Sequence, residues 1–519
     1  PENSDYMILG YDHGMGVTWD GGENWYHPDN QSLAQFYAVG YDMSYPYRVA
    51  GGLQDNGSHL AYHTNPAGGP IRFEQWLRVG GGDGMYNVIE GCTNRYLYNE
   101  SQFGPISRLD LWTGERKGIR YTDPELRWNW NSPILISPHD CNVIYHGANK
   151  VLRSEYRGES WEVISDDLTK ADPVTLATGK GGDGNIQYAT ITTLDESPLQ
   201  AGLLWVGTDD GNVQVTRNGG RDWTLLNDNI PNNPEYWVSR VAASHHDPGT
   251  AYVSFTGMRR DDFRAFVYKT TDFGESWTDI SANLPEEPIN VIQEHDDNPN
   301  VLFVGTDFAV YTSVDGGESW TRMKNNMPTQ PAYDLKIHPR ENDLIVATHG
   351  RGIYIADVSP LSQVTEEVLA EDAWFFQPES KVRWIQADMR EYASDNFDGE
   401  SEPMAIPLYY HLASDAGGGV TFTVYQGNVT IATLDGPSEA GMHKVLWNMD
   451  KREERSDEQV EQMRERYARF GREVSEDELR YTSTPAPLGD YTIVMSIDGR
   501  PVMEREASIL KDEWWMERR

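Results

Sequence analysis

The chain has 519 residues, enough for two or three ordinary domains or for one large β array with a small domain beside it. Acidic residues outnumber basic ones, 81 to 43, and the net charge of −38 repels nucleic acid and anionic lipid. No apolar run approaches the length that spans a bilayer, so neither a nucleic-acid partner nor a membrane span is predicted.

Lysine is scarce within this acidic composition, with 11 Lys against 32 Arg. A surface rich in carboxylates and poor in lysine stays hydrated at high salt and repels its own copies. Two interpretations therefore stay open: an acidic, self-repelling surface protein, or a protein adapted to saline surroundings.

Residues 1–34 are predicted to be the end of an upstream blade of a repeat fold. The strand-like segment "YMILGYDHG" is followed at once by "TWDGGENW", the first copy of a recurring motif. The chain begins with Pro1 and shows neither an initiator Met nor a signal peptide, so we expect a processed or partial chain.

Residues 35–360 repeat one unit. The segments "INVIQEHDDNPNVLFVGTDFAVYTSVDGGESWTRM" (289–323) and "ATITTLDESPLQAGLLWVGTDDGNVQVTRNGGRDWTLLN" (189–227) share the same order of strands and turns. Four short strands joined by hairpin turns are the blade of a β-propeller. Seven such groups can be traced, so we predict an all-β propeller of about seven blades, and the period-2 patterning excludes stacked helix pairs.

After residue 360 the period disappears. Residues 361–400 are expected to form a linker, and residues 401–519 contain alternating stretches such as "VTFTVYQGN" that are typical of a small antiparallel sandwich. Its charged insertion, residues 450–480, is expected to form a solvated helix in part or to be mobile, and its charge requires no ligand.

The recurring motif is Ser/Thr-x-Asp-x-Gly-x-Ser/Thr-Trp. Its Asp suits backbone N–H groups inside a hairpin, its Gly supplies a positive φ, and its Trp ring is expected to be buried between blades. Asn218 and Tyr156 replace the acid in two copies, and a catalytic carboxylate would not recur along one chain. We therefore predict a structural role for Asp20, Trp25, Trp161, Asn218, Trp223, Asp272, Trp277, Asp315 and Trp320.

Only two cysteines occur, which excludes a disulfide scaffold and a Cys-type zinc site. Cys92 and Cys141 fall at similar positions of successive repeats. A disulfide needs Cα atoms within about 7 Å, and equivalent turns of neighbouring blades are often farther apart. Two free thiols are the expectation.

The motif is the Asp-box, or bacterial-neuraminidase (BNR) repeat, and residues 1–360 resemble the sortilin-type Asp-box propellers of exported bacterial proteins often labelled BNR-repeat glycosyl hydrolases. The resemblance is carried by "GGLQDNGS", "GGDGMYNV", "LWVGTDDGNVQVTRNGG" and "THGRGIYI", and "PAPLGDYTIVMSIDGRPV" resembles their closing Ig-like domain. It implies an extracellular, cell-surface or periplasmic location. Because members often carry two tandem propellers, it also implies a second propeller upstream. It says little about activity, since propellers host unrelated functions.

Candidate ligand residues lie in the turns opposite the Asp boxes, around the predicted channel mouth. Carboxylates that converge there could serve glycoside cleavage, hold a cation or bind the hydroxyls and amines of a ligand. Asp before Gly also suits a tight turn without any function. The candidates are Asp55, Asp83, Asp183, Asp209, Asp210, Asp262, Asp307, His349 and Arg351, with Arg259, Arg260 and Asp261 beside them.

No HExxH motif, nucleophile elbow, P-loop or dinucleotide-binding Gly motif is found, so no cofactor and no metal is predicted. Sialidases bind their carboxylate ligand with three arginines, and the predicted mouth is poor in arginine. The leading hypothesis is an exported propeller that binds or scaffolds a peptide, a protein or a polysaccharide. The alternatives are a glycoside hydrolase resembling the two-propeller xyloglucanases and a structural subunit of a larger surface assembly.

Overall fold

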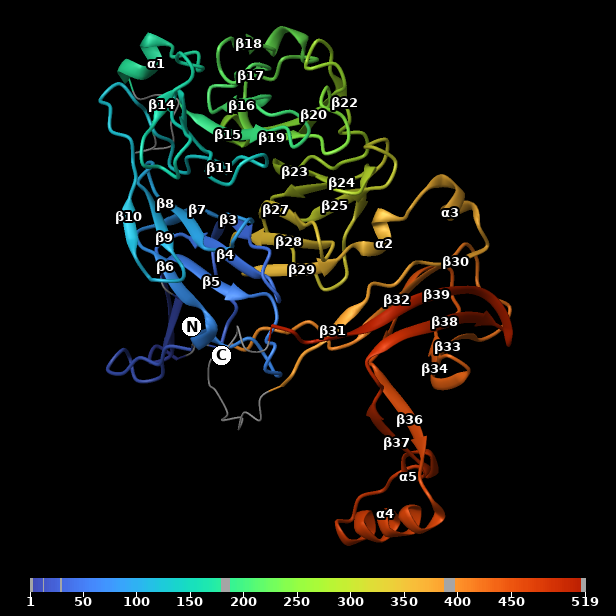
Figure 1. Ribbon diagram of the computed structural model, residues 1–519. Helices are drawn as coiled ribbons and strands as arrows, with labels where there is room; N and C mark the ends of the chain where they lie inside the picture. Colours follow the sequence, from blue (N-terminus) through green and yellow to red (C-terminus); the bar gives the residue numbers. More distant parts are fainter. Residues whose placement is uncertain (1–2, 13, 29, 179–186, 387–396, 515–519) are drawn as a thin grey trace. The chain divides into compact units, whose positions relative to one another are not determined.

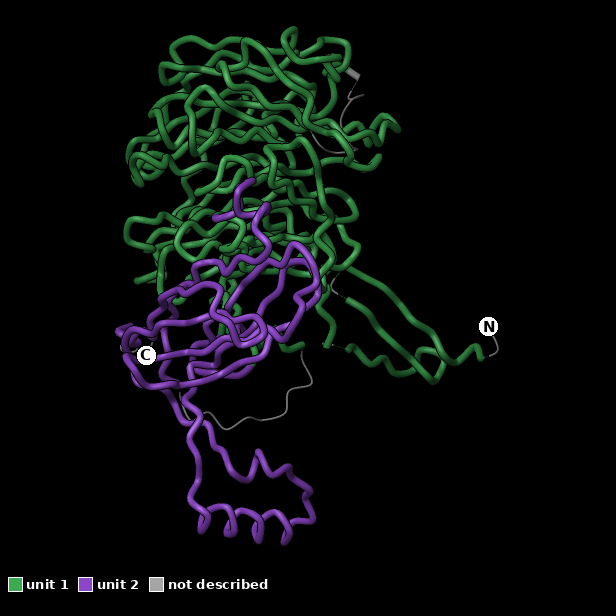
Figure 2. Tube along the Cα trace, turned by 90° about the vertical axis from the view of Figure 1, so that its right-hand side faces the viewer, with its two compact units in different colours: residues 1–64, 70–362, 391–400 green, residues 65–69, 363–390, 401–519 purple. Residues whose placement is uncertain are grey.

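The computed structural model describes residues 3–12, 14–28, 30–178, 187–386 and 397–514 (Figure 1). The chain divides into two compact units, residues 1–64, 70–362 and 391–400 and residues 65–69, 363–390 and 401–519 (Figure 2). Antiparallel sheets dominate both units, so the prediction of an all-β protein is confirmed.

The first unit contains a propeller of seven blades, six with four strands and the last with three. In each blade the strands are hydrogen-bonded in chain order, and the first strand lies against the first strand or the sheet of the next blade. Short helical segments occur in the connections: η1 (Phe73–Gln75), α1 (Pro173–Thr178), η2 (Asn227–Asn229), η3 (Met258–Arg260) and α2 (Ser359–Ser362).

The strands of blades 1 to 4 are β3 (Phe36–Tyr41), β4 (Arg48–Leu53), β5 (Gly57–Tyr62) and β6 (Leu77–Gly80); β7 (Gly84–Ile89), β8 (Tyr96–Ser101), β9 (Ile106–Asp110) and β10 (Arg116–Gly118); β11 (Ile134–Ile136), β12 (Ile144–Gly147), β13 (Val151–Ser154) and β14 (Glu162–Val163); and β15 (Ile191–Glu196), β16 (Leu204–Thr208), β17 (Val213–Thr216) and β18 (Thr224–Leu225). Those of blades 5 to 7 are β19 (Trp237–Ala243), β20 (Ala251–Gly257), β21 (Asp262–Thr270) and β22 (Thr278–Asp279); β23 (Ile289–His295), β24 (Asn298–Thr306), β25 (Val310–Ser313) and β26 (Thr321–Arg322); and β27 (Ala332–His338), β28 (Asp343–Thr348) and β29 (Ile353–Asp357).

Buried apolar side chains form clusters at every interface between consecutive blades. The second strand of a blade is packed on both faces, which explains why β16 and β28 are buried along their whole length. Blades 1 and 2 approach so closely that a Cβ on Gly40 would lie 2.0 Å from the carbonyl oxygen of Asn87. Only glycine fits there.

The ring closes between blade 7 and blade 1 through side-chain packing and an isolated β-bridge between Gln35 and His349. Phe36 and Val49 pack against Ile345 and Ala347, and the Tyr47 hydroxyl donates to Asp343 over 2.9 Å. The chain just before β3 also accepts a hydrogen bond from Gly350 N at Ala34 O, 2.9 Å. We call this interface the closure seam.

The Asp-box hairpins connect the third and fourth strands of their blades. Asp272 Oδ1 accepts from Thr270 Oγ1 and from Ser276 N, both over 2.8 Å, so its carboxylate closes its own hairpin. Box tryptophans reach back to the preceding blade: Nε1 of Trp161, Trp223 and Trp320 donates to the carbonyl oxygens of Ile119, Ile164 and Ile280 over 2.7, 3.1 and 2.8 Å. These bonds join neighbouring blades on one face of the ring.

Hairpin β1 (Met7–Tyr11) and β2 (Gly14–Thr18) precedes the ring and carries its own Asp box, closed by a bridge between Val17 and Tyr26. Asp20 Oδ1 accepts from Thr18 Oγ1 over 2.7 Å, as in the ring. However, all five residues of β1 are exposed, and Trp25 is 37% exposed rather than buried between blades.

The expectation of free thiols is wrong, because Cys92 and Cys141 form a disulfide across 49 residues. Cys92 lies in the turn between β7 and β8, and Cys141 lies in the equivalent turn of the next blade. In this protein the two equivalent turns approach each other, and their Cα atoms are only 6.3 Å apart. Glu90 shapes the turn by accepting from the backbone N–H of Cys92 over 3.0 Å.

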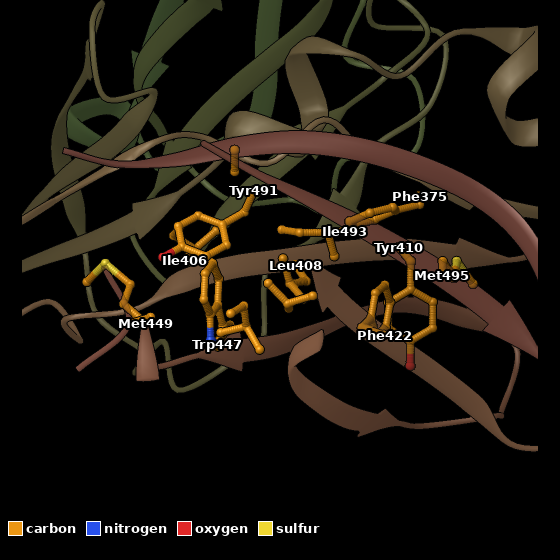
Figure 3. Close-up of a cluster of buried hydrophobic side chains, with 14 of the residues drawn as sticks. Phe375, Ile406, Leu408, Tyr410, Phe422, Trp447, Met449, Tyr491, Ile493 and Met495 are labelled. Carbon is orange, nitrogen blue, oxygen red and sulfur yellow. The ribbon is translucent and has the colours of Figure 1, made fainter. Parts of the chain in front are cut away.

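The second unit is a β-sandwich of a three-stranded and a five-stranded sheet, with helix α3 (Glu366–Ala370) preceding it. Its core includes Trp447 and Tyr491, with ring centroids 4.8 Å apart (Figure 3). The Ig-like label remains a prediction. The sheets are β30 (Ala373–Phe375), β32 (Ile406–Leu412) and β35 (Gly441–Trp447), and β31 (Lys381–Arg383), β39 (Arg500–Lys511), β38 (Gly489–Ile497), β33 (Val420–Gln426) and β34 (Val429–Gly436).

The charged insertion forms an arm on the sandwich. Strands β36 (Asp450–Glu454) and β37 (Tyr481–Pro485) pair, and helices α4 (Asp457–Arg469) and α5 (Glu476–Arg480), which connect them in the chain, form the end of the arm (Figure 1). Ser456 and Gln459 form a capping box that starts α4. Val460 is the buried residue of this helix, so α4 is a solvated helix held by its cap and its ion pairs.

Candidate ligand site at the channel mouth

Irregularities in the first strands of the blades place side chains at the channel mouth. The pairing of the first and second strands shifts at Tyr37 in β3, Asn290 in β23 and Tyr333 in β27, one residue after each strand begins. A β-bulge turns its extra residue out of the normal alternation. The same shift recurs at Thr192 and Ser239 in blades 4 and 5.

Aromatic rings from both sides of the closure seam meet at this mouth. Tyr333 stacks on His349 with 4.3 Å between ring centroids, and Tyr37 lies 5.1 Å from His349 and 6.3 Å from Tyr333. The Tyr37 hydroxyl donates to Gln54 Oε1 over 2.6 Å and is also hydrogen-bonded to Trp130. Burial raises the pKa of Tyr37 to about 12 and lowers the pKa of His349, so at neutral pH these rings carry no charge.

Charged groups of both signs flank the aromatic rings. Asp307 accepts from Asn290 Nδ2 over 3.0 Å, and its charge raises the pKa of Tyr333, although burial is the larger cause. Arg259 lies over the Trp237 ring at 4.1 Å. We define the aromatic rim as Tyr37, Trp130, Trp237, Tyr333 and His349. Together with Asp307 and Arg259, the rim offers stacking surfaces, a hydrogen-bond acceptor and a cation.

Asp55 and Asp83 meet on the adjoining turns of blades 1 and 2. The Asp83 carboxylate accepts from Asp55 N over 2.8 Å, and Asp83 N donates to Gln102 Oε1 over 2.9 Å. Asp55 has φ of 62°, a conformation that Asp tolerates in turns. Asp83 thus supports the turn that presents Asp55 beside Tyr37.

Asp209 and Asp210 hold backbone segments of blade 4 and its incoming link. Asp209 accepts from Thr190 N and Thr190 Oγ1 over 2.8 and 2.7 Å, and burial raises its pKa to about 7. Asp210 accepts from Thr208 Oγ1 over 2.6 Å and from Lys170 N over 2.8 Å. With side chains 5% and 4% exposed, both acids are turned inward rather than toward a ligand.

The remaining candidates make other contacts. Asp262 pairs with Arg264 over 2.6 Å, and this bond lowers the pKa of Asp262. Arg351 is exposed, and its backbone N–H donates to Thr348 Oγ1. Arg260 bonds to the Tyr188 hydroxyl, Asp261 has φ of 56° and ends η3, and Asp183 lies outside the described residues.

Below the mouth, side chains fill the channel. Arg240 of blade 5 pairs with Asp334 of blade 7 over 2.7 Å, and Asp334 Oδ2 accepts from Val39 N over 3.0 Å. Asp334 is fully buried, and burial raises the pKa of the neighbouring Tyr86 to about 12. This ion pair therefore joins blades 5 and 7 across the ring.

Of the residues predicted from the sequence, Asp55, Asp307 and His349 lie at or beside the aromatic rim, while Tyr37, Trp130, Trp237 and Tyr333 were not among the predicted residues. Alignment of the repeats carries a signal for two of them, because Tyr37 and Tyr333 both stand second in a blade's first strand. The β-bulge that turns these side chains toward the mouth cannot be recognised from the pattern of apolar and polar residues.

Seven blades, boxes that fasten their own hairpins and tryptophans that join neighbouring blades define this protein as an Asp-box β-propeller. The Sortilin-Vps10 family model (Sortilin, neurotensin receptor 3) matches residues 265–376. The oligoxyloglucan-reducing end-specific xyloglucanase of Emericella nidulans is 25% identical over 224 residues, 41% of this chain and 25% of that protein. These matches fit the Asp-box (BNR-repeat) propeller family with its glycosyl hydrolase-like labelling, so the predicted resemblance is confirmed.

Solved structures give further similarities. The GH74 xyloglucanase from Xanthomonas campestris has 17% identity and a TM-score of 0.47, covering 64% of this chain and 53% of that chain. YCF48 from Cyanidioschyzon merolae has 10% identity and a TM-score of 0.43, covering 62% and 94%. YCF48 bound to D1 peptide has 11% identity and a TM-score of 0.44, covering 68% and 99%. The match thus spans a quarter of the curated xyloglucanase and about half of the Xanthomonas chain.

Proposed function

We propose that this protein is an exported or cell-surface binding propeller whose aromatic rim holds a peptide, a protein or a glycan. The observation that carries the proposal is the rim itself, where half-buried rings from blades 1, 5 and 7 surround Asp307 and Arg259 above a filled channel. Stacked rings with a few polar groups suit ligand recognition. The Cys92–Cys141 disulfide supports export, because disulfides persist mainly in oxidising compartments. Among the described helices, none has the length and apolar content to cross a membrane.

A glycoside hydrolase is the second candidate, favoured by the similarity to the Emericella nidulans xyloglucanase. Retaining and inverting glycosidases need a pair of carboxyl groups about 5–10 Å apart. Asp307 supplies one carboxylate at the rim, whereas Asp209 and Asp210 are turned inward. The second group of such a pair would be Asp55, which lies beside Tyr37, or a carboxylate of a further propeller. We therefore place hydrolysis behind binding, and a structural subunit of a surface assembly third.

We also propose that hairpin β1–β2 is part of a further blade of an upstream propeller. The equivalent second strands β16, β20 and β28 are buried throughout, whereas β1 is exposed throughout. Such an exposed apolar strand marks an interaction surface. A longer form of the protein that includes the upstream sequence should protect the β1 amides from hydrogen exchange.

Binding at the rim is tested with immobilised polysaccharides and a random peptide library, using the full chain and the variants Tyr333→Ala and Arg259→Ala. Trp112→Ala is the matched control, because Trp112 is 69% exposed and lies in the turn between β9 and β10, on the box face. We expect at least tenfold weaker binding for the rim variants and unchanged binding for the control. Sugar release that disappears in Asp307→Asn would instead favour the hydrolase, and equal binding by all four proteins would reject the rim.

A further inference from the structure

A cavity lies on the face of the ring that carries the Asp boxes, away from the aromatic rim. It has a volume of about 790 Å³ and is lined by the box hairpin of blade 3, the turn between β11 and β12, and residues of β8 and β9 in blade 2. Tyr96, Arg108, Asp140 and Arg157 belong to its wall. Polar and charged side chains therefore dominate it, in contrast to the apolar interfaces between the blades.

The box of blade 3 departs from the repeat at this cavity. Tyr156 stands where other copies have Asp or Asn, and it is 65% exposed. The hairpin is still held by Ser154 Oγ, which accepts from Gly158 N over 2.9 Å. Loss of the Asp has therefore left the hairpin closed while placing a phenol ring at the cavity.

The next residue, Arg157, occupies a position that favours glycine. Its φ is 56°, and the equivalent residues Gly21, Gly219 and Gly316 have φ of 72°, 73° and 74°. A left-handed conformation is unfavourable for arginine, and such residues concentrate at functional sites. Phe273 is the other exception among the boxes, and its ring packs under Arg217 at 3.8 Å.

The guanidinium of Arg157 is held in place by an aromatic ring, but its positive charge is not paired with a carboxylate of the described chain. It lies 4.7 Å above the Tyr96 ring, and its backbone carbonyl accepts from Arg108 over 2.8 Å. Among the described residues it makes no ion pair, and its Nε is buried without a hydrogen-bond partner. A buried Nε without a hydrogen-bond partner is uncommon in folded proteins, and a ligand at the cavity would be close to this guanidinium.

Two acids of the cavity wall, Glu159 and Glu155, form ion pairs with basic side chains, and a third, Asp140, keeps one carboxylate oxygen without a donor from the described residues. Glu159 pairs with Arg108 over 2.9 Å and with Lys117 over 2.5 Å, and Glu155 pairs with Arg153. Asp140 Oδ1 takes both hydrogen bonds from Asn142, which leaves Oδ2 as an acceptor without a partner in the described chain. Within the described part of the chain, the cavity thus offers the Arg157 guanidinium as a cation without an ion pair and Asp140 Oδ2 as an acceptor.

We propose that this cavity binds a small carboxylate ligand that also carries amino or hydroxyl donors. The carboxylate pairs with the Arg157 guanidinium in the planar geometry that arginine favours, and the donors reach Asp140 Oδ2. Amino acids and sugar acids both have this chemistry. The site is independent of the rim, because it is built by the opposite turns of blades 2 and 3.

Titration calorimetry on the full chain tests the proposal with L-glutamate and D-galacturonate as probes and D-galactose as the uncharged match. Arg157→Gly removes the guanidinium and relieves the left-handed backbone, so this variant should fold at least as well as the parent. Arg157→Gln is the second variant. Arg221→Gln is the control, because it removes an exposed arginine from the box hairpin of blade 4.

We expect saturable binding of at least one carboxylate probe, no binding of D-galactose, and at least tenfold weaker binding by both Arg157 variants with Arg221→Gln unchanged. Binding of L-glutamate alone identifies an amino-acid site, and binding of D-galacturonate alone identifies a sugar-acid site. Absence of binding by either probe up to about 10 mM, or equal binding by the parent and Arg157→Gly with its melting temperature retained, overturns the proposal.

Discussion

Replacing His146 with leucine should make the propeller less sensitive to acid. His146 lies on β12 in blade 3, is fully buried, and packs 4.5 Å from the Trp128 ring. Neither ring nitrogen has a hydrogen-bond partner among the described residues. Burial, and to a smaller extent the Arg120 charge, lowers the pKa of His146 to about 3.

The sign of the effect follows from proton uptake on unfolding. Because the folded pKa lies below the unfolded value of about 6.5, the unfolded chain binds more protons between pH 6.5 and 3, and stability falls as the pH falls through this window. At pH 5 the loss from this one group is about 2 kcal/mol. With an unfolding entropy of about 2.1 cal/mol/K per residue, the loss corresponds to about 3 °C in the melting temperature of the propeller.

Differential scanning calorimetry at pH 7.5 and pH 5 measures this change. His146→Leu should melt at or above the temperature of the parent at pH 7.5, and its decrease on acidification should be smaller by about 3 °C. His27→Leu, at an exposed histidine, is the control and should behave as the parent. The burial of His295 and His338 lowers their pKa values to about 4, but this contribution is common to all three proteins. Equal decreases in the parent and His146→Leu would refute the reasoning.

Three further predictions concern the disulfide, an Asp-box hairpin and a buried aspartate of the ring. The double variant Cys92→Ser/Cys141→Ser should lose about 2–4 kcal/mol, as expected for a bond that closes a 49-residue loop, and thiol titration with and without denaturant should find no free thiol in the parent. Asp272→Asn should be nearly neutral in thermal melting because Asn218 already closes a hairpin with its amide, whereas Asp272→Ala should cost about 1 kcal/mol; equal losses would contradict the role of the acceptor oxygen. Asp209 has a raised pKa of about 7, so its charge destabilises the fold as the pH rises from about 4 to 7; Asp209→Asn should therefore raise the melting temperature more at pH 8 than at pH 5, and the reverse order would reject the assignment.

The repeat pattern predicted the propeller well because each blade repeats its strand alternation and its turns within one local stretch of chain. The recurrence of "VGT" before a turn and of the Asp box after it fixed the strand order, and hence which turns share a face. Strands β30 and β31 lie in the range expected to be linker, since three residues each are too short to show alternation. The Cys92–Cys141 pair was missed because the distance between equivalent turns of neighbouring blades is a tertiary quantity.

The candidate site could be predicted from the repeat pattern less well than the fold. Turn acids look alike in sequence, yet Asp307 faces the rim while Asp209 is held by Thr190 inside the ring. The difference arises because the segment that enters blade 4 supplies Thr190 as a donor to Asp209. Such connecting segments differ in sequence from blade to blade, so the donor cannot be predicted from the repeat. Tyr37 and Tyr333 are about 300 residues apart, and only closure of the ring brings them together.

The proposed ligand site lies on the closure seam, so a bound ligand would affect the stability of the ring. Tyr37 belongs to the first blade, and Tyr333 and His349 belong to the last, so a ligand stacked on all three would add a contact across the closure seam. Such a ligand would stabilise the interface between the last blade and the first. Occupancy should slow amide exchange first in β3 and β28, on either side of the seam, and leave blades 3 and 4 unchanged.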